Sequence, residues 1–181
     1  TGYVHNDLKD DNIYVTSDGD IRVIDMGIAQ KIGEHIDEVG FTLTHVGISQ
    51  MEGWNFHFND IFSLGICLYD SLIGKTPLED LIDSHDNPLN AFVEVYAKIN
   101  KGIAVKTKEL ATTSVVADII RKAFNPAPYV ELRKRISEHN EKIKQAEQDG
   151  GKDGKVAYVR TLVDSVVSEL SSVPGRDYYL S

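Results

Sequence analysis

The chain has 181 residues, of which 41% are hydrophobic and 26% charged, a composition typical of one globular domain. Its formal net charge of -9 argues against a nucleic-acid or anionic-membrane partner, because phosphate groups are bound by surplus lysine and arginine. Cys67 is the only cysteine, so we expect neither a disulfide framework nor a thiolate metal site, and a reducing compartment is favoured. No apolar run approaches the ~18 residues of a membrane span, and the sequence does not open with a signal-peptide pattern.

The first segment with a clear pattern is a β-hairpin over residues 13–25. β-Branched and aromatic residues dominate both halves, and Asp18-Gly19 lies between them. Asp-Gly is the strongest short hairpin signal, since a type I′ turn needs positive φ at both central positions. A two-residue loop there predicts that Asn12 lies opposite Asp25, whereas a longer loop would shift the register and leave both residues at the open end. The hairpin therefore predicts that two oxygen-bearing side chains meet at one site.

The middle of the chain combines a long irregular segment with one strongly apolar helix. Residues 28–58 contain scattered glycines and no sustained period, and loops of this length tend to be functional or mobile. Asn59-Asp60 is then predicted to cap a helix over about 61–73, which Gly74 ends. Apolar residues cover nearly all faces of this helix, so we expect it to be buried.

The C-terminal third is predicted to be helical. Amphipathic helices are expected over 91–100 and 114–124, and a charged helix over 131–148 follows the proline-rich break at 125–128. A flexible, glycine-rich linker is expected over 149–154. Beyond it, apolar residues recur at the spacing of one helix face, at Val159, Leu162, Val163, Val166, Val167 and Leu170. This stripe must pack on something, either the parent domain or a partner.

Two motifs resemble the catalytic loop and the metal-binding triplet of protein kinases. They are His5-Asn6-Asp7-Leu8-Lys9-Asp10-Asp11-Asn12 and, thirteen residues after Asn12, Asp25-Met26-Gly27. The family patterns are His-Arg-Asp-Leu-Lys-x-x-Asn and Asp-Phe-Gly. A lone His-x-Asp string would be a weak signal, but the spacing to the asparagine, the intervening hairpin and the Asp-x-Gly triplet make the match specific.

The resemblance implies a fold and a set of roles. The fold would be the C-terminal lobe of a protein kinase, mainly α-helical with a small β-hairpin. Asp7 would orient the substrate hydroxyl and accept its proton, and Lys9 would place a cation beside the γ-phosphate of ATP. Asn12 and Asp25 would hold Mg²⁺ (or Mn²⁺), a hard ion that prefers oxygen ligands. These four residues are the candidate catalytic, cofactor-binding and metal-binding residues, whereas Asp10, Asp11 and Asp18 are interpreted as a solvated acidic loop.

A second signature supports the same family. The run Asp60-Ile-Phe-Ser-Leu-Gly65 resembles the buried central helix of kinase C-terminal lobes. The resemblance implies that Asp60 hydrogen-bonds the catalytic-loop backbone and so holds Asp7 in place. A helix N-cap is the simpler interpretation of Asp60, and the two roles are compatible.

An activation segment is expected over residues 28–52. Glu52 matches the glutamate that closes this segment in the family, although Gln50-Met51 precede it in place of Ala-Pro. Either Arg133 or Arg135 is expected to supply its ion-pair partner.

Two departures from the family pattern carry consequences. Asn6 replaces the arginine that usually pairs with a phosphorylated activation-segment residue, which suggests regulation without that phosphate switch. Met26 replaces phenylalanine, a swap of similar apolar size that should still pack.

The resemblance also divides the chain. Residues 1–140 would form the kinase C-terminal lobe, and 141–181 a linker and a C-terminal amphipathic helix. No Gly-x-Gly-x-x-Gly follows a strand and no Val-Ala-x-Lys strand occurs, so the N-terminal lobe that clamps ATP is expected to be absent from this chain. The sequence runs from Thr1 straight into the catalytic motif, so we expect an upstream part that was removed, omitted or supplied separately. The glycines of 150–154 lie in a polar stretch and are rejected as a phosphate loop.

The expected function is a Ser/Thr protein kinase that is inactive as this chain alone. Lys9 suits serine/threonine-directed kinases better than tyrosine-directed ones. The expected partners are a protein substrate, the missing N-terminal lobe and a possible partner of the C-terminal helix, in the cytoplasm, including that of a host cell for a secreted effector or viral protein. Two alternatives stay open: a small-molecule kinase of the aminoglycoside or choline type, and a pseudokinase or binding module.

The remaining reactive side chains give no second site at this level. Cys67 is interpreted as packing inside the apolar helix. Metal-ligand spacing is missing from the other histidines, His35, His45, His57, His85 and His139.

Overall fold

The computed structural model describes residues 2–36, 40–105, 110 and 114–171. In chain order the elements are β1 (Tyr3–Val4), the 3₁₀ turn η1 (Asp10–Asn12), β2 (Ile13–Val15), β3 (Ile21–Val23), β4 (Gln30–Lys31), α1 (Ile48–Met51), α2 (His57–Ile73), α3 (Glu79–Asp83), α4 (Pro88–Lys101), α5 (Ser114–Ala123), α6 (Ala127–Glu138) and α7 (Asn140–Ser171). The fold is mainly α-helical, as predicted, with two small antiparallel sheets, β1–β4 and β2–β3. Among the described helices, none has both the length and the apolar character needed to cross a bilayer.

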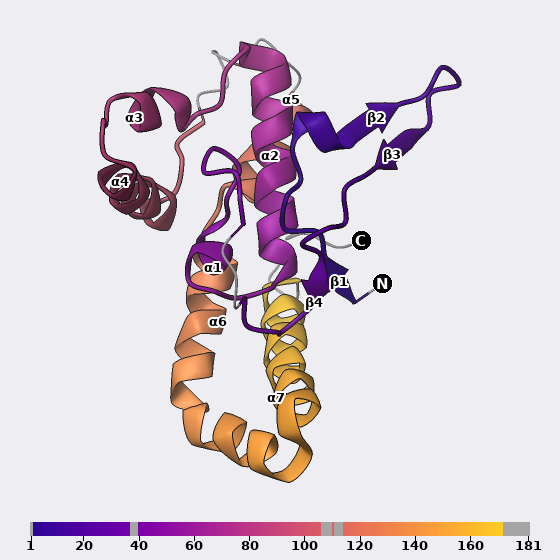
Figure 1. Cartoon of the computed structure of the whole chain (residues 1–181), viewed down its shortest axis with the longest axis vertical. Coiled ribbons are helices and arrows are strands. Elements are labelled where there is room, and N and C mark those ends of the chain that lie inside the picture. The colour runs from indigo at the N-terminus through magenta and orange to yellow at the C-terminus, as the bar shows by residue number, and fades with distance from the viewer. Residues whose placement is uncertain (1, 37–39, 106–109, 111–113, 172–181) are drawn as a thin grey trace.

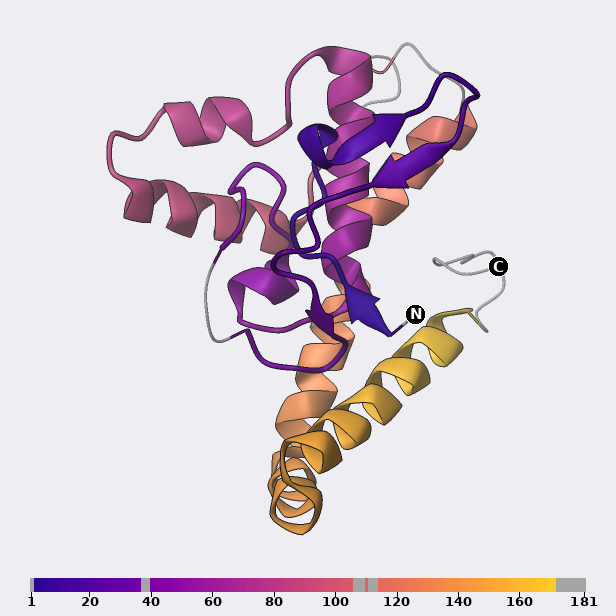
Figure 2. The same ribbon diagram turned by 45° about the vertical axis from the view of Figure 1, so that its right-hand side comes forward.

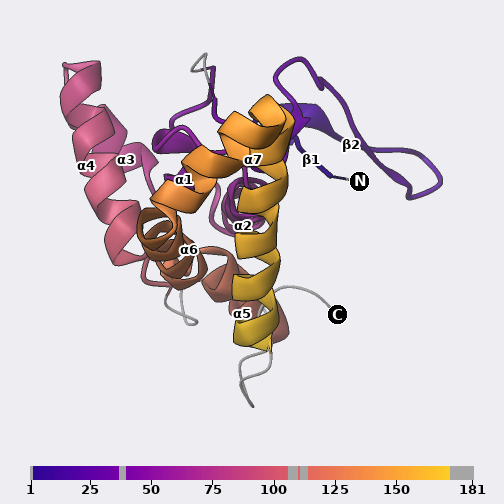
Figure 3. The same cartoon turned by 90° about the horizontal axis from the view of Figure 1, so that it is seen from below.

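Helix α2 is the central element of the fold. Figure 3 shows it near the middle of the molecule, with α1, α5, α6 and α7 around it. The helix begins at His57 after the N-cap residue Phe56, so Asn59 and Asp60 lie in its first turn and the predicted Asn59-Asp60 cap is wrong. The reason is that the Asp60 carboxylate accepts hydrogen bonds from another segment of the chain instead of capping its own helix.

The core lies on one side of α2, where α5 approaches closely. A Cβ atom added at Gly65 would lie only 2.5 Å from the Cβ of Ala123, so the contact between the two helices requires glycine. The rings of Phe62 and Phe124 pack beside it, with centroids 5.5 Å apart. On another face of α2, Leu64, Leu68 and Leu72 are 38–42% exposed. The expectation that the helix is buried all round is therefore wrong, because the described neighbours cover only part of its circumference.

The hairpin β2–β3 projects from the side of α2 (Figure 1) and has a longer loop than predicted. Its pairs are Ile13↔Val23, Tyr14↔Arg22 and Val15↔Ile21. The loop is closed by the backbone N–H of Thr16, which donates to the carbonyl of Asp20 at 2.8 Å. Asn12 consequently lies opposite Ile24, and the backbone N–H of Ile24 donates to the carbonyl of Asn12 at 3.0 Å. Asp25 is the next residue along the chain. The prediction of a two-residue turn is thus wrong, whereas the predicted placement of Asn12 and Asp25 at the open end of the hairpin is confirmed.

Helices α6 and α7 form a long helical hairpin at one end of the molecule (Figure 2). Helix α6 begins at Ala127, inside the expected break, because the Asn125 side chain accepts the N–H of Ala127 at 3.0 Å and prolines are tolerated in a first helical turn. The predicted continuous helix over 131–148 is divided at His139. The flexible linker expected over 149–154 is wrong: the chain is helical on both sides of Gly151, whose φ of 60° and ψ of -153° make the turn.

The apolar stripe of α7 packs on the parent lobe. Val159, Leu162, Val163 and Val166 are all buried and belong to the main hydrophobic core, and Val167 packs against it. Gly33 is one residue of the lobe that meets this stripe: a Cβ atom added there would lie 3.6 Å from Val159 Cγ1. The stripe was expected to pack either on the parent domain or on a partner, and the structure shows it packed on the parent lobe. The Leu170 side chain lies outside the described part of the chain.

Candidate active site

Asp60 ties the catalytic loop to the central helix. One of its carboxylate oxygens accepts the backbone N–H of His5 at 2.8 Å, and the other accepts that of Asn6 at 3.0 Å. Burial raises the pKa of this half-buried carboxyl and outweighs the opposite effect of the two N–H donors. The backbone contact implied by the family resemblance is therefore present.

The ring of His5 links the two halves of the site. Its Nε2 lies 2.9 Å from the carbonyl oxygen of Ile24, and its Nδ1 accepts the backbone N–H of Asp7 at 3.3 Å. A carbonyl oxygen can only accept, so Nε2 carries the proton and Nδ1 is the acceptor, a consistent neutral tautomer. The buried imidazole thus fixes Asp7 relative to Ile24, the residue before Asp25.

Three side chains converge on Asp7. The Thr42 hydroxyl donates to Oδ1 at 3.0 Å, and Lys9 Nζ lies 3.1 Å from Oδ2. The amide of Asn12 donates to the Asp7 carbonyl at 2.8 Å and to Oδ2 at 3.3 Å. Lys9 also donates to Thr42 Oγ1 at 3.3 Å, so Asp7, Lys9 and Thr42 each contact the other two. The structure therefore brings Asp7, Lys9 and Asn12 together, as expected, and adds Thr42, which sequence reasoning missed.

Asp25 stands across a cleft from this cluster. A cleft of about 200 Å³ is lined by both carboxylates together with Ile28, Gly40, Phe41 and Thr42. Asp25 has a φ of 62°, in the left-handed region that non-glycine residues seldom adopt, and such strain is concentrated at functional sites. Its exposed carboxylate and the carbonyl arm of the Asn12 amide are hard oxygen donors, which fit Mg²⁺ or Mn²⁺.

Asn6 occupies the place of the family's arginine in a different way. It adopts a φ of 68°, and its amide donates to the Asn55 side chain and to the carbonyl of Ile28. The side-chain oxygen of Asn6 accepts from the Asn59 amide at 3.3 Å, and the backbone carbonyl of Asn6 accepts from the Gln50 amide at 2.7 Å. A buried network of neutral amides thus ties Asn6 to Ile28 and Gln50, at the two ends of the irregular segment.

Glu52, which closes the segment expected to be the activation segment, is held by three side chains. It forms an ion pair with Arg133 at 2.7 Å and accepts the hydroxyls of Tyr96 and Tyr129, both at 2.6 Å. Burial opposes the ionisation of Glu52, but these three donors outweigh it and hold its pKa below its usual range. Of the two arginines expected as partner, Arg133 is the one used, whereas Arg135 pairs with Glu169 on α7.

Comparisons with known proteins point to one family. The family described as "Protein kinase domain" matches residues 1–145. Similar proteins include CBL-interacting protein kinase 1 of Oryza sativa subsp. japonica, 29% identical over 135 residues that make up 70% of this chain. A probable serine/threonine-protein kinase of Clostridium perfringens is 29% identical over 152 residues, or 80% of the chain. The aligned regions cover only 27% and 21% of these two relatives, so the chain spans about a quarter of their length.

The chain belongs to the protein kinase family. Its fold is that of the C-terminal lobe, mainly α-helical, with the hairpin that precedes Asp25-Met26-Gly27.

Proposed function

We propose that this chain is the catalytic lobe of a Ser/Thr protein kinase that transfers the γ-phosphate of ATP to a hydroxyl of a protein substrate. The observation that carries the proposal is the bonding of Asp7, whose carboxylate is held by Thr42, Lys9 and Asn12 at the wall of a cleft shared with Asp25. The similarity to the probable serine/threonine-protein kinase of Clostridium perfringens supports the same activity.

Asp7 is positioned to act on the substrate hydroxyl. Thr42 donates to one of its oxygens and Lys9 lies beside the other, so a hydroxyl entering the cleft would meet a carboxylate in a fixed orientation. As the hydroxyl oxygen bonds to the γ-phosphorus and the bond to the ADP oxygen breaks, Asp7 accepts the hydroxyl proton. Lys9 then has two roles: it orients Asp7 before reaction and places its cation beside the transferred phosphoryl group.

Asn12 and Asp25 are proposed to hold the metal. The cleft carries two carboxylates, which would repel a triphosphate unless a cation neutralised them. Mg²⁺ or Mn²⁺ would supply that charge and bridge to phosphate oxygens. The strained backbone at Asp25 and the bonded amide of Asn12 keep both donors in place before the ion arrives.

Nucleotide clamping is proposed to come from a lobe outside residues 1–181, because this sequence contains neither the glycine-rich loop nor the strand lysine of the family pattern. The buried, reduced Cys67 supports a cytoplasmic location, which is likewise a proposal.

The experiment compares the chain alone with the chain joined to its nucleotide-binding lobe, using labelled ATP, Mg²⁺ and a protein acceptor. Phosphate transfer to serine or threonine is expected only in the joined protein, and Asp25→Ala should abolish it. A joined, folded protein that binds ATP but transfers no phosphate would leave a pseudokinase as the better description. Transfer to an aminoglycoside or choline instead of a protein would favour a small-molecule kinase.

A further inference from the structure

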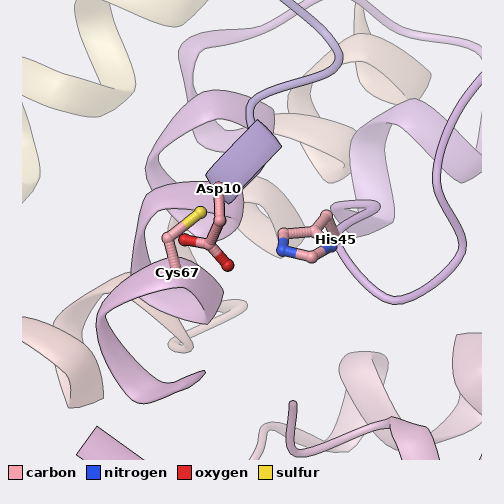
Figure 4. Close-up of side chains that lie close together, drawn as sticks. All are labelled: Asp10, His45 and Cys67. Carbon is pink, nitrogen blue, oxygen red and sulfur yellow. The ribbon is translucent and has the colours of Figure 1, made fainter. Parts of the chain in front are cut away.

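A second cluster of reactive side chains lies behind the catalytic loop. Asp10 on η1, His45 in the activation segment and Cys67 on α2 each bring one potential ligand atom within 4.8 Å of the other two. Figure 4 shows the Asp10 carboxylate between the sulfur of Cys67 and a ring nitrogen of His45. The three residues come from separate segments, which explains why their spacing in sequence gives no metal-site pattern.

The histidine of this cluster has an unused, buried nitrogen. His45 is only 9% exposed, and its Nε2 is one of the few buried polar side-chain atoms of the described chain with no hydrogen-bond partner. The other nitrogen, Nδ1, lies 2.9 Å from the Thr44 hydroxyl, which fixes the ring orientation. A buried ring nitrogen without a partner is costly in either tautomer. In the tautomer in which Nδ1 donates to Thr44, Nε2 is a free acceptor that could bind a metal ion. An outer contact of this kind on Nδ1 is what orients a histidine that binds a metal through Nε2.

The charges around the cluster also favour a cation. Burial, followed by the nearby Asp10 carboxylate, raises the pKa of the Cys67 thiol to about 12. Asp70, one turn further along α2, has its pKa raised by burial and then by the same Asp10 carboxylate. Burial lowers the pKa of His45, and the negative charges of Asp10, Asp70 and Asp7 oppose this effect. The negative charges around the cluster are ones that a bound cation would neutralise.

We propose that Asp10, His45 and Cys67 form a binding site for Zn²⁺, with Asp70 or a water molecule as the fourth ligand. Thiolate, imidazole and carboxylate together are the donor set of zinc, and they differ from the all-oxygen set proposed for the catalytic ion. Zinc bonds of about 2.0–2.3 Å put tetrahedral ligand atoms roughly 3.6 Å apart. The present separations of up to 4.8 Å therefore need to shrink by only about 1 Å. On binding, the Cys67 thiol releases its proton to solvent and its sulfur bonds the metal as thiolate.

Zinc at this position would join three parts of the proposed active site. Asp10 directly follows Lys9, and His45 lies three residues after Thr42, the residue that donates to Asp7. A metal bound to both, and to Cys67 on the central helix, would restrain the catalytic loop and the activation segment together. This consequence rests on the proposed function, whereas binding itself does not.

The test is a titration of the purified 181-residue chain with Co²⁺, followed by displacement with Zn²⁺, in excess Mg²⁺. Because Cys67 is the only cysteine, a thiolate-to-cobalt absorption band can come only from this residue. We expect one equivalent of Co²⁺ to give that band with tetrahedral d–d absorption, and Cys67→Ser to abolish it. His45→Gln and Asp10→Asn should weaken binding at least about tenfold. Asp11→Asn and His85→Gln are the matched controls and should bind as the wild type does.

Asp10 is exposed, so its variant keeps the test decisive if Cys67→Ser or His45→Gln does not fold. Retention of the thiolate band in Asp25→Ala would separate this site from the proposed catalytic ion. Absence of a thiolate band from the folded wild-type chain would overturn the proposal, and so would equal affinity of Asp10→Asn and Asp11→Asn. None of these measurements requires phosphate transfer.

Discussion

Replacing Asp60 with asparagine tests how the catalytic loop is held. The two carboxylate oxygens each accept one backbone N–H, from His5 and from Asn6. Asparagine keeps one acceptor oxygen and turns an NH₂ group toward the second donor, so one charge-assisted bond is lost and the other becomes neutral. Hydrogen bonds to charged groups contribute about 1.5–3 kcal/mol each. We therefore expect Asp60→Asn to lower the free energy of unfolding by about 2–4 kcal/mol.

Urea unfolding followed by circular dichroism measures this change. Asp83→Asn is the matched control, because Asp83 is exposed at the end of α3 and should change the free energy by less than about 0.5 kcal/mol. Hydrogen exchange at the amides of His5 and Asn6 should become faster in Asp60→Asn alone. Equal unfolding free energies for the two variants, with unchanged exchange at both amides, would refute the reasoning.

Further predictions concern the core and the activation-segment anchor. Gly65→Ala should lower the free energy of unfolding by about 1–3 kcal/mol, because the new methyl would overlap Ala123. Gly150→Ala, at a helical glycine with open space around it, should instead raise it by about 0.5–1 kcal/mol in the same urea titration, and equal effects would contradict the packing argument. Glu52→Gln should cost about 1–3 kcal/mol at neutral pH, since the buried Tyr129 hydroxyl keeps only a neutral acceptor. The pKa of Glu52 is depressed in the folded state, so its stabilisation is complete above the ordinary value of about 4.3 and is lost as the pH falls through the lower folded value. The difference between wild type and Glu52→Gln should therefore shrink in acid unfolding curves, and a difference that stays constant with pH would contradict this assignment.

Features set by short-range pattern could be predicted from the sequence. The catalytic motif, the hairpin and the C-terminal apolar stripe depend on residues close together in the chain, and the structure contains all three. The contact between Asp60 and the catalytic-loop backbone was also expected, but only through the family resemblance.

Features that depend on which segments of the chain contact one another could not be predicted from the sequence. The register of the hairpin is set by the Thr16–Asp20 closure, which competes with the two-residue turn that Asp18-Gly19 favours. Thr42 lies in an irregular segment with no pattern, and only the fold brings it to Asp7.

The same reasoning applies to the helices. The sequence of α2 shows that apolar residues occupy nearly all of its faces, but the exposure of Leu64 depends on where the neighbouring helices lie. At the glycine-rich segment, composition indicates a break in the helix, and the structure reduces that break to the single residue Gly151.

The most direct test of the proposed chemistry is the rate of phosphate transfer by the protein that joins this chain to its nucleotide-binding lobe. Asp7→Asn keeps the size of the side chain and removes its capacity to accept a proton. If Asp7 is the base, the rate should fall by about 10²–10⁴-fold, with ATP binding and the unfolding transition little changed, while Asp11→Asn keeps the wild-type rate. Transfer by Asp7→Asn at the wild-type rate would contradict the account.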